Sequence, residues 1–154
     1  IVTIGDGSYI FSVPSACHFV SAAYHLPLLI VVYNNQSYDA VKRATRAVHP
    51  QGWAARTDHF PLSDLPMTPH YEKICEAFGG YGERVERPDQ LGSALERALS
   101  AVREEKRQAL LNVNAHNGIP VRPGRGIPPY FQEMDYYVVT GTPPVIGYVS
   151  AWQY

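Results

Sequence analysis

Glycine and polar residues of the kind that bind a metal ion and an anion stand at two places in this sequence. The GDGS segment (residues 5–8) directly follows a short apolar run at residues 1–4. The Asn pair (residues 34–35) closes a second apolar run and begins twenty-seven residues after Gly7. Ligands bind open α/β sheets where parallel strands end. The placement of the two clusters therefore predicts one site for a divalent cation and a diphosphate.

The candidate metal ligands are oxygen donors from both clusters. Asp6 supplies a carboxylate and Asn35 a neutral amide oxygen. A main-chain carbonyl from the following turn, most simply that of Ser37, is a candidate third ligand. Mg²⁺ prefers such hard oxygen donors in an octahedral shell that phosphate oxygens and water complete.

The other residues of the GDGS segment suit an anion. Gly5 and Gly7 permit unusual backbone angles and a close approach of phosphate to the main chain. Ser8 and the amides beyond Gly7 can donate hydrogen bonds to phosphate oxygens. The simpler alternative is a tight turn with an Asp cap and an unrelated Asn turn. It requires both pieces to reach matching strand ends by accident.

The elements that must position these clusters form a βαβ unit. Residues 1–4 and 28–33 are uninterrupted rather than alternating apolar runs, which favours parallel strands covered on both faces. Residues 13–24 have room for about three helical turns, and Pro14 suits the first of them. Both polar clusters are then expected at the carboxyl ends of parallel strands.

The α/β alternation continues through the middle of the chain. Apolar periodicity and the positions of Gly and Pro predict helices at 38–48, 71–78 and 91–102, brief strands at 83–86 and 109–113, and a long irregular segment at 49–69. We predict a doubly wound α/β domain with a mainly parallel sheet and helices on both faces. We place this domain in residues 1–114 and expect the Pro-, Gly- and Tyr-rich residues 115–154 to form a poorly ordered tail.

Composition narrows the functional classes. The 154 residues are 45% hydrophobic, enough for one real core, and the formal charge of −1 gives no electrostatic case for nucleic acid. The longest apolar run, residues 26–33, is far shorter than the roughly 20 residues that span a bilayer. We therefore expect no membrane partner. Two cysteines do not make a disulfide framework, so we expect a reducing, cytoplasmic location.

Taken together, the motifs resemble the diphosphate-binding domain of thiamine diphosphate enzymes, in the branch of decarboxylases and acetolactate-synthase-like proteins. The resemblance covers residues 1–113 and rests on a GDG triplet followed about thirty residues later by Asn-Asn, and on the stretches GDGSYIF, LLIVVYNN, QSYDAV, YEKICEAFGG and QALLNV. It implies thiamine diphosphate and Mg²⁺ as cofactors. The sequence has no initiator methionine and begins inside a strand, so we expect a fragment of a longer protein.

The resemblance also implies roles for individual residues. Asp6, Asn35 and the main-chain oxygen of Ser37 would bind the metal, the GDGS segment would contact the diphosphate, and Tyr38 would lie against the cofactor. The branch usually has glycine after that aromatic residue, where this chain has Asp39. GDGS favours a decarboxylase-like relative over acetolactate synthase proper, which often has a GDAS-type segment.

In this family the catalytic Glu belongs to the pyrimidine-binding domain of the partner subunit, so we assign no catalytic residue here. The parent protein is expected to decarboxylate or carboligate 2-oxoacids as a homodimer or homotetramer. The fragment alone is expected to have little or no turnover.

Other interpretations remain to be weighed. A dinucleotide fingerprint would need glycine where the chain has Ile10, and neither a GK[ST] phosphate loop nor a cysteine cluster for iron and sulfur is present. His18 and His25 are spaced too far apart on a helix for one zinc ion, and the remaining histidines are most simply solvated loop residues. The alternative from a different class is a non-catalytic, nucleotide-like binding or assembly module that keeps the fold. Magnesium-dependent binding of thiamine diphosphate separates the two.

Overall fold

The computed structural model describes residues 1–65, 67 and 69–115 of the chain. All of them belong to one compact unit, Ile1–Gly118. The tail predicted for residues 115–154 lies outside the described residues apart from Ala115, so the predicted domain boundary stays a prediction.

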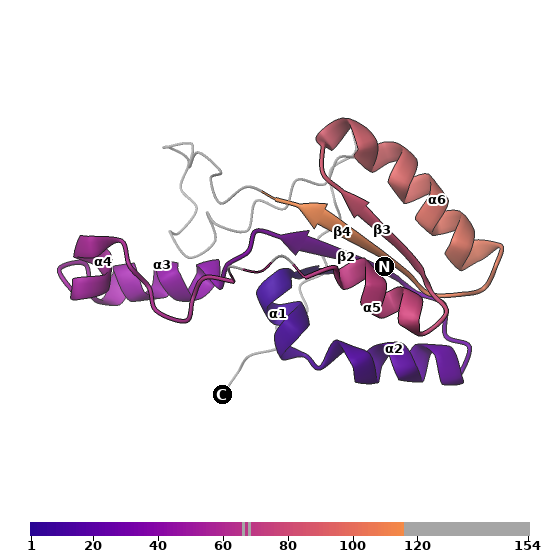
Figure 1. Cartoon of the computed structure of the whole chain (residues 1–154), viewed down its shortest axis with the longest axis horizontal. Coiled ribbons are helices and arrows are strands. Elements are labelled where there is room, and N and C mark those ends of the chain that lie inside the picture. The colour runs from indigo at the N-terminus through magenta and orange to yellow at the C-terminus, as the bar shows by residue number, and fades with distance from the viewer. Residues whose placement is uncertain (66, 68, 116–154) are drawn as a thin grey trace, which may run out of the picture. The chain divides into compact units, whose positions relative to one another are not determined.

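Four parallel strands form the sheet (Figure 1). They are β1 (Val2–Gly5), β2 (Leu29–Asn34), β3 (Tyr81–Val85) and β4 (Ala109–Asn114), in the spatial order β1-β2-β4-β3. The predicted parallel sheet is therefore confirmed. β2 lies in the interior between β1 and β4, which explains why its sequence is apolar without interruption.

Helices cover both faces of this sheet, as predicted: α6 (Leu91–Arg103) lies on one face, and α1 (Asp6–Phe11), α2 (Pro14–Ala23) and α5 (Tyr71–Ala77) lie on the other (Figure 1). Helices α3 (Asp39–Val48) and α4 (Trp53–Thr57) lie beyond the carboxyl ends of the strands (Figure 1). A short 3₁₀ helix, η1 (Pro88–Gln90), precedes α6. No helix among the described residues is long and apolar enough to cross a membrane.

The two faces have separate cores because successive residues of a strand point to opposite sides. Leu29 and Val31 of β2 pack on the face where α6 buries its alanines. Ile30 and Val32 pack on the other face, with Tyr9 of α1 and residues of α5. The second core includes Tyr9 of α1, so it supports the helix that begins within the GDGS segment.

Three details differ from the sequence-based expectation. Helix α1 begins at Asp6 itself and is separated from α2 by Ser12 and Val13, and the left-handed φ of 54° at Val13 breaks the helical path. The segment predicted to be irregular contains the short helix α4. The apolar side predicted for α3 is uncovered by the described residues, since Val41 is 52% exposed and Val48 70%.

Candidate functional site

The two polar clusters lie side by side at the carboxyl edge of the sheet. β1 ends at Gly5 and β2 at Asn34, and the register pairs Gly5 with Tyr33. Because the strands are parallel neighbours in this register, the chain leaves both at the same edge. Asp6 and Asn35 are the residues that follow these ends.

The Asp6 carboxylate connects the two clusters. The side chain is buried, and its Oδ1 accepts a hydrogen bond from the Gly7 amide at 2.9 Å. Its Oδ2 accepts one from the amide of Gln36, thirty residues further along, at 2.7 Å. Burial raises the pKa of Asp6 above its usual value, although the amides of Gly7, Gln36 and Asn35 oppose that shift. A divalent cation beside this carboxylate would offset the cost of keeping it ionised.

The turn after β2 holds Asn35 and Ser37 in a fixed arrangement. The Asn35 Oδ1 accepts a hydrogen bond from the Ser37 amide at 3.1 Å, and Gln36 between them has a left-handed φ of 58°. Ser37 is buried, and its hydroxyl donates to the carbonyl of Ser63 at 3.2 Å. A single antiparallel bridge to Asp64 closes the turn. The turn is therefore pinned by residues of the long connection between α3 and α5.

Tyr38 packs on the GDGS segment. A Cβ added to Gly7 would lie only 2.6 Å from the Tyr38 ring, so this glycine permits a close approach of that ring. Gly5 has an ordinary extended backbone, with φ −73° and ψ 153°, and a Cβ there would meet nothing within 4 Å. Gly5 therefore does not use the unusual backbone angles that a glycine permits. Ser8 is exposed, and Asp39 forms an ion pair with Arg43.

Replacing Gly7 by alanine tests the contact with Tyr38. The added methyl group must displace the aromatic ring or the start of α1, so we expect Gly7→Ala to lower the free energy of unfolding by about 1–3 kcal/mol. Gly92→Ala is the matched control, because Gly92 is also helical and has open space around its Cβ. It should stabilise the protein by up to about 1 kcal/mol. Urea unfolding measures both, and equal effects would contradict the packing described here.

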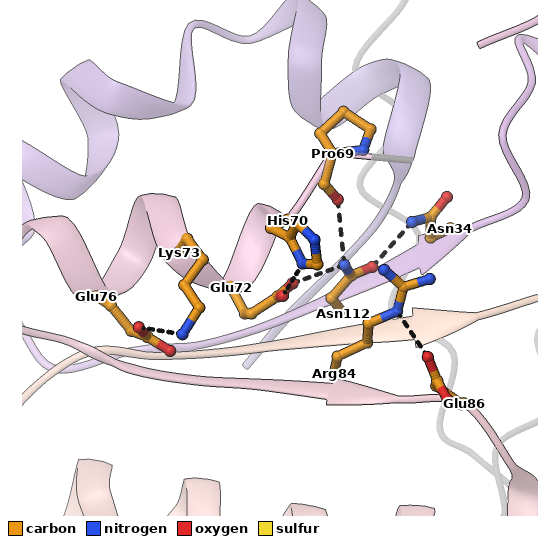
Figure 2. Close-up of polar contacts among 9 residues, drawn as sticks. All are labelled: Asn34, Pro69, His70, Glu72, Lys73, Glu76, Arg84, Glu86 and Asn112. Carbon is orange, nitrogen blue, oxygen red and sulfur yellow. Dashed lines mark hydrogen bonds and ion pairs between the residues drawn. The ribbon is translucent and has the colours of Figure 1, made fainter. Parts of the chain in front are cut away.

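A buried polar network behind the Asn pair was not foreseen from the sequence (Figure 2). The Asn34 amide donates to Asn112 Oδ1 on β4 at 3.1 Å, and Asn112 Nδ2 donates to Glu72 Oε2 on α5 at 2.8 Å. His70 Nδ1 lies 2.8 Å from the other Glu72 oxygen. Burial alone would raise the pKa of Glu72, but the hydrogen bonds from Asn112, its own backbone and His70 outweigh it and hold that pKa below its usual value.

This network ties the site to the core. It connects β2, β4 and α5 immediately next to Asn35. These hydrogen bonds therefore fix the end of β2 that precedes Asn35. The one available signal was Asn112, a lone polar residue in the apolar run of β4. His70, which we expected to be a solvated loop residue, is exposed but bonded to Glu72.

The donor set fits a hard cation held together with an anionic ligand. Among residues 1–65, 67 and 69–115, no cluster of three His, Cys, Asp or Glu side chains could hold a metal ion by itself. Asn34 Oδ1 and Tyr71 Oη are among the buried side-chain atoms of the described part that have no hydrogen-bond partner. One carboxylate with amide and carbonyl oxygens nearby is a set that needs phosphate oxygens or water to complete it, as Mg²⁺ commonly does.

A zinc site around His18 is excluded by its hydrogen bonds. Its Nε2 lies 2.8 Å from the Tyr9 hydroxyl, and its Nδ1 lies 2.6 Å from Gln108 Oε1. Both ring nitrogens are occupied within the core, so neither is available to a metal.

Comparison with known protein families matches residues 1–113 to the family described as "Thiamine pyrophosphate enzyme, C-terminal TPP binding domain". Among curated proteins, 2-hydroxyacyl-CoA lyases of Oryza sativa subsp. japonica and Arabidopsis thaliana are each 34% identical over 110 residues. 2-Hydroxyacyl-CoA lyase 1 of Mus musculus is 34% identical over 116 residues. Each match covers 71% of this chain but only 17–18% of the relative, so the chain spans a small part of their length.

Among solved structures, the thiamine diphosphate-dependent 4-hydroxybenzoylformate decarboxylase of Rhodococcus jostii RHA1 superposes with a TM-score of 0.59 at 24% identity. The match covers 74% of this chain and 19% of the decarboxylase chain. At this level of identity the likeness establishes the shared α/β fold.

Proposed function

Since the chain belongs to the thiamine pyrophosphate enzymes, as their C-terminal TPP-binding domain, we propose that it anchors thiamine diphosphate through Mg²⁺ at the carboxyl edge of β1 and β2. The observation that carries this proposal is the buried Asp6 carboxylate, which accepts amide hydrogen bonds from both motif segments at once. It places the acidic group of one cluster against the turn that holds the candidate carboxamide and carbonyl ligands.

Each residue of the site has a role in this proposal. Asp6, the side chain of Asn35 and the main-chain oxygen of Ser37 bind the metal. Asn35 Oδ1 and the Asp6 oxygens each retain acceptor capacity beyond the hydrogen bonds described above. The GDGS segment lies against the diphosphate. Tyr38, which already packs on Gly7, forms one wall of the pocket.

The bound cofactor supplies the carbanion-stabilising chemistry, while these residues hold it in place and orient it. The parent protein in our proposal is a carbon–carbon lyase. The curated relatives favour cleavage of a 2-hydroxyacyl-CoA, because they are 34% identical to this chain over the 110–116 aligned residues and carry that name. Decarboxylation or carboligation of a 2-oxoacid, expected from the sequence motifs, is the second candidate.

Catalysis in this proposal requires segments outside this chain. A pyrimidine-binding domain from a partner subunit would complete the cofactor site, in a homodimer or homotetramer. The isolated chain would then bind the cofactor with little or no turnover, and we place the parent protein in the cytoplasm.

The test is binding of thiamine diphosphate by calorimetry, with Mg²⁺ and after its removal by EDTA. We expect binding with Mg²⁺ and at least about a tenfold loss of affinity without it, because Asp6, Asn35 and Ser37 would hold the diphosphate through the metal. Thiamine without phosphate is the control ligand and should bind far more weakly. A scaffold that only keeps the fold would bind neither compound, and that result would refute the proposal.

A further inference from the structure

Tyr71 carries the one buried hydroxyl of the described residues that has no hydrogen-bond partner. It is the first residue of α5, is 1% exposed, and packs its ring edge-on against Tyr9 with the centroids 5.3 Å apart. A buried hydroxyl without a partner loses its hydrogen bond to water and gains nothing in return. Such a group usually has a partner that the protein chain itself does not provide.

The Tyr71 ring lies beside the helix that begins at Asp6, because it packs on Tyr9 of that helix. Burial raises the pKa of Tyr71 to about 12, and the next contributions to that shift come from Asp6 and then Tyr38. The Tyr71 hydroxyl is thus close enough to the Asp6 carboxylate and to Tyr38 to interact with them electrostatically. A phenol with a raised pKa stays protonated at neutral pH and is a hydrogen-bond donor.

Tyr9 provides an internal comparison, because it lies in the same core and touches the same ring. Its hydroxyl is 2.8 Å from His18 Nε2 and is therefore satisfied by the chain. Two neighbouring buried tyrosines thus differ in one respect. The hydroxyl of Tyr9 has a structural partner, whereas that of Tyr71 has none among the residues described.

We propose that the Tyr71 hydroxyl donates a hydrogen bond to an anionic oxygen of the bound diphosphate, which makes it a further ligand-contacting group of this site. The inference rests on the proposed function. The Asp6 oxygens are less suitable acceptors, because each already accepts a backbone amide and metal coordination would use their remaining lone pairs. A phosphate oxygen bound beside Asp6 retains free lone pairs.

The experiment compares Tyr71→Phe with Tyr9→Phe in the full chain. For each variant, affinity for thiamine diphosphate and for inorganic pyrophosphate is measured with Mg²⁺, and urea unfolding is measured without ligand. We expect Tyr71→Phe to weaken both affinities by at least about tenfold, because a hydrogen bond to an anionic oxygen is lost. The unliganded stability should stay the same or rise, since the hydroxyl has no partner there.

Tyr9→Phe should give the reverse pattern, with lower stability and unchanged affinities, because it removes a satisfied hydrogen bond away from the ligand. Equal affinities for wild type and Tyr71→Phe would overturn this inference and leave the proposed function standing. A wild-type chain that binds neither ligand would overturn both. Loss of stability in Tyr71→Phe without loss of affinity would make the hydroxyl structural and would also overturn the inference.

Discussion

The Asp6→Asn variant is expected to weaken Mg²⁺-dependent binding of thiamine diphosphate by at least about a hundredfold. Asparagine has nearly the same shape and keeps one oxygen to accept an amide, but it lacks the negative charge that binds the cation. Burial already disfavours the charged form of Asp6, so the neutral replacement should leave the protein folded.

Asp89→Asn is the matched control for this loss. Asp89 lies in η1, and its side chain is 68% exposed and paired with Arg87. Removing its charge should leave the affinity unchanged. Titration calorimetry measures both variants, and circular dichroism confirms that both are folded. If Asp6→Asn bound the cofactor as tightly as the wild type, the proposed metal site would be refuted.

The second large effect is expected for Asn112→Ala and concerns stability rather than binding. Asn112 is completely buried and bonds both Asn34 and Glu72. The substitution leaves the Asn34 amide without an acceptor and deprives the buried Glu72 carboxylate of a donor. We expect it to lower the free energy of unfolding by about 3 kcal/mol. The urea midpoint should fall while the dependence on urea concentration stays constant.

Asn114→Ala is the control on the same strand, because Asn114 is exposed at the end of β4. Its effect should stay within about 0.5 kcal/mol, as is usual for surface positions. If the two variants were equally stable, the network of Figure 2 would contribute nothing to the fold.

The sequence was sufficient to predict the parallel sheet and the positions of Asp6 and the Asn pair at its carboxyl edge. Uninterrupted apolar runs at residues 1–4 and 28–33 indicated buried parallel strands, and the structure has β1 and β2 there. The positions of Asp6 and the Asn pair after those runs then determined where they lie, because parallel neighbours end at a common edge. The motif resemblance added the family, which the comparison of residues 1–113 confirmed.

The buried network could not be predicted in the same way, because its members are far apart in sequence. Asn34 and Asn112 are separated by 78 positions, and Glu72 and Asn112 by 40. Local sequence patterns do not indicate which pairs of polar side chains come into contact within the folded core. Glu72 also lies in an ordinary helical sequence, where a glutamate is most simply a solvated residue. The lack of a partner for the Tyr71 hydroxyl could not be predicted either, since a tyrosine in an amphipathic helix is most simply interpreted as a core residue.

Asp6 accepts its hydrogen bond from the main-chain amide of Gln36 and not from the Gln36 side chain. The hydrogen bond between the two motif segments therefore does not depend on which side chain stands at position 36. The Gln36 side chain is exposed and forms no part of that contact. Residue 36 can therefore be substituted without loss of this hydrogen bond by any residue with a main-chain N–H, which proline lacks. Selection on the turn then acts on its left-handed backbone shape, which glycine and asparagine adopt most readily. Homologues with a different residue at position 36 are therefore expected to keep the hydrogen bond between the two segments.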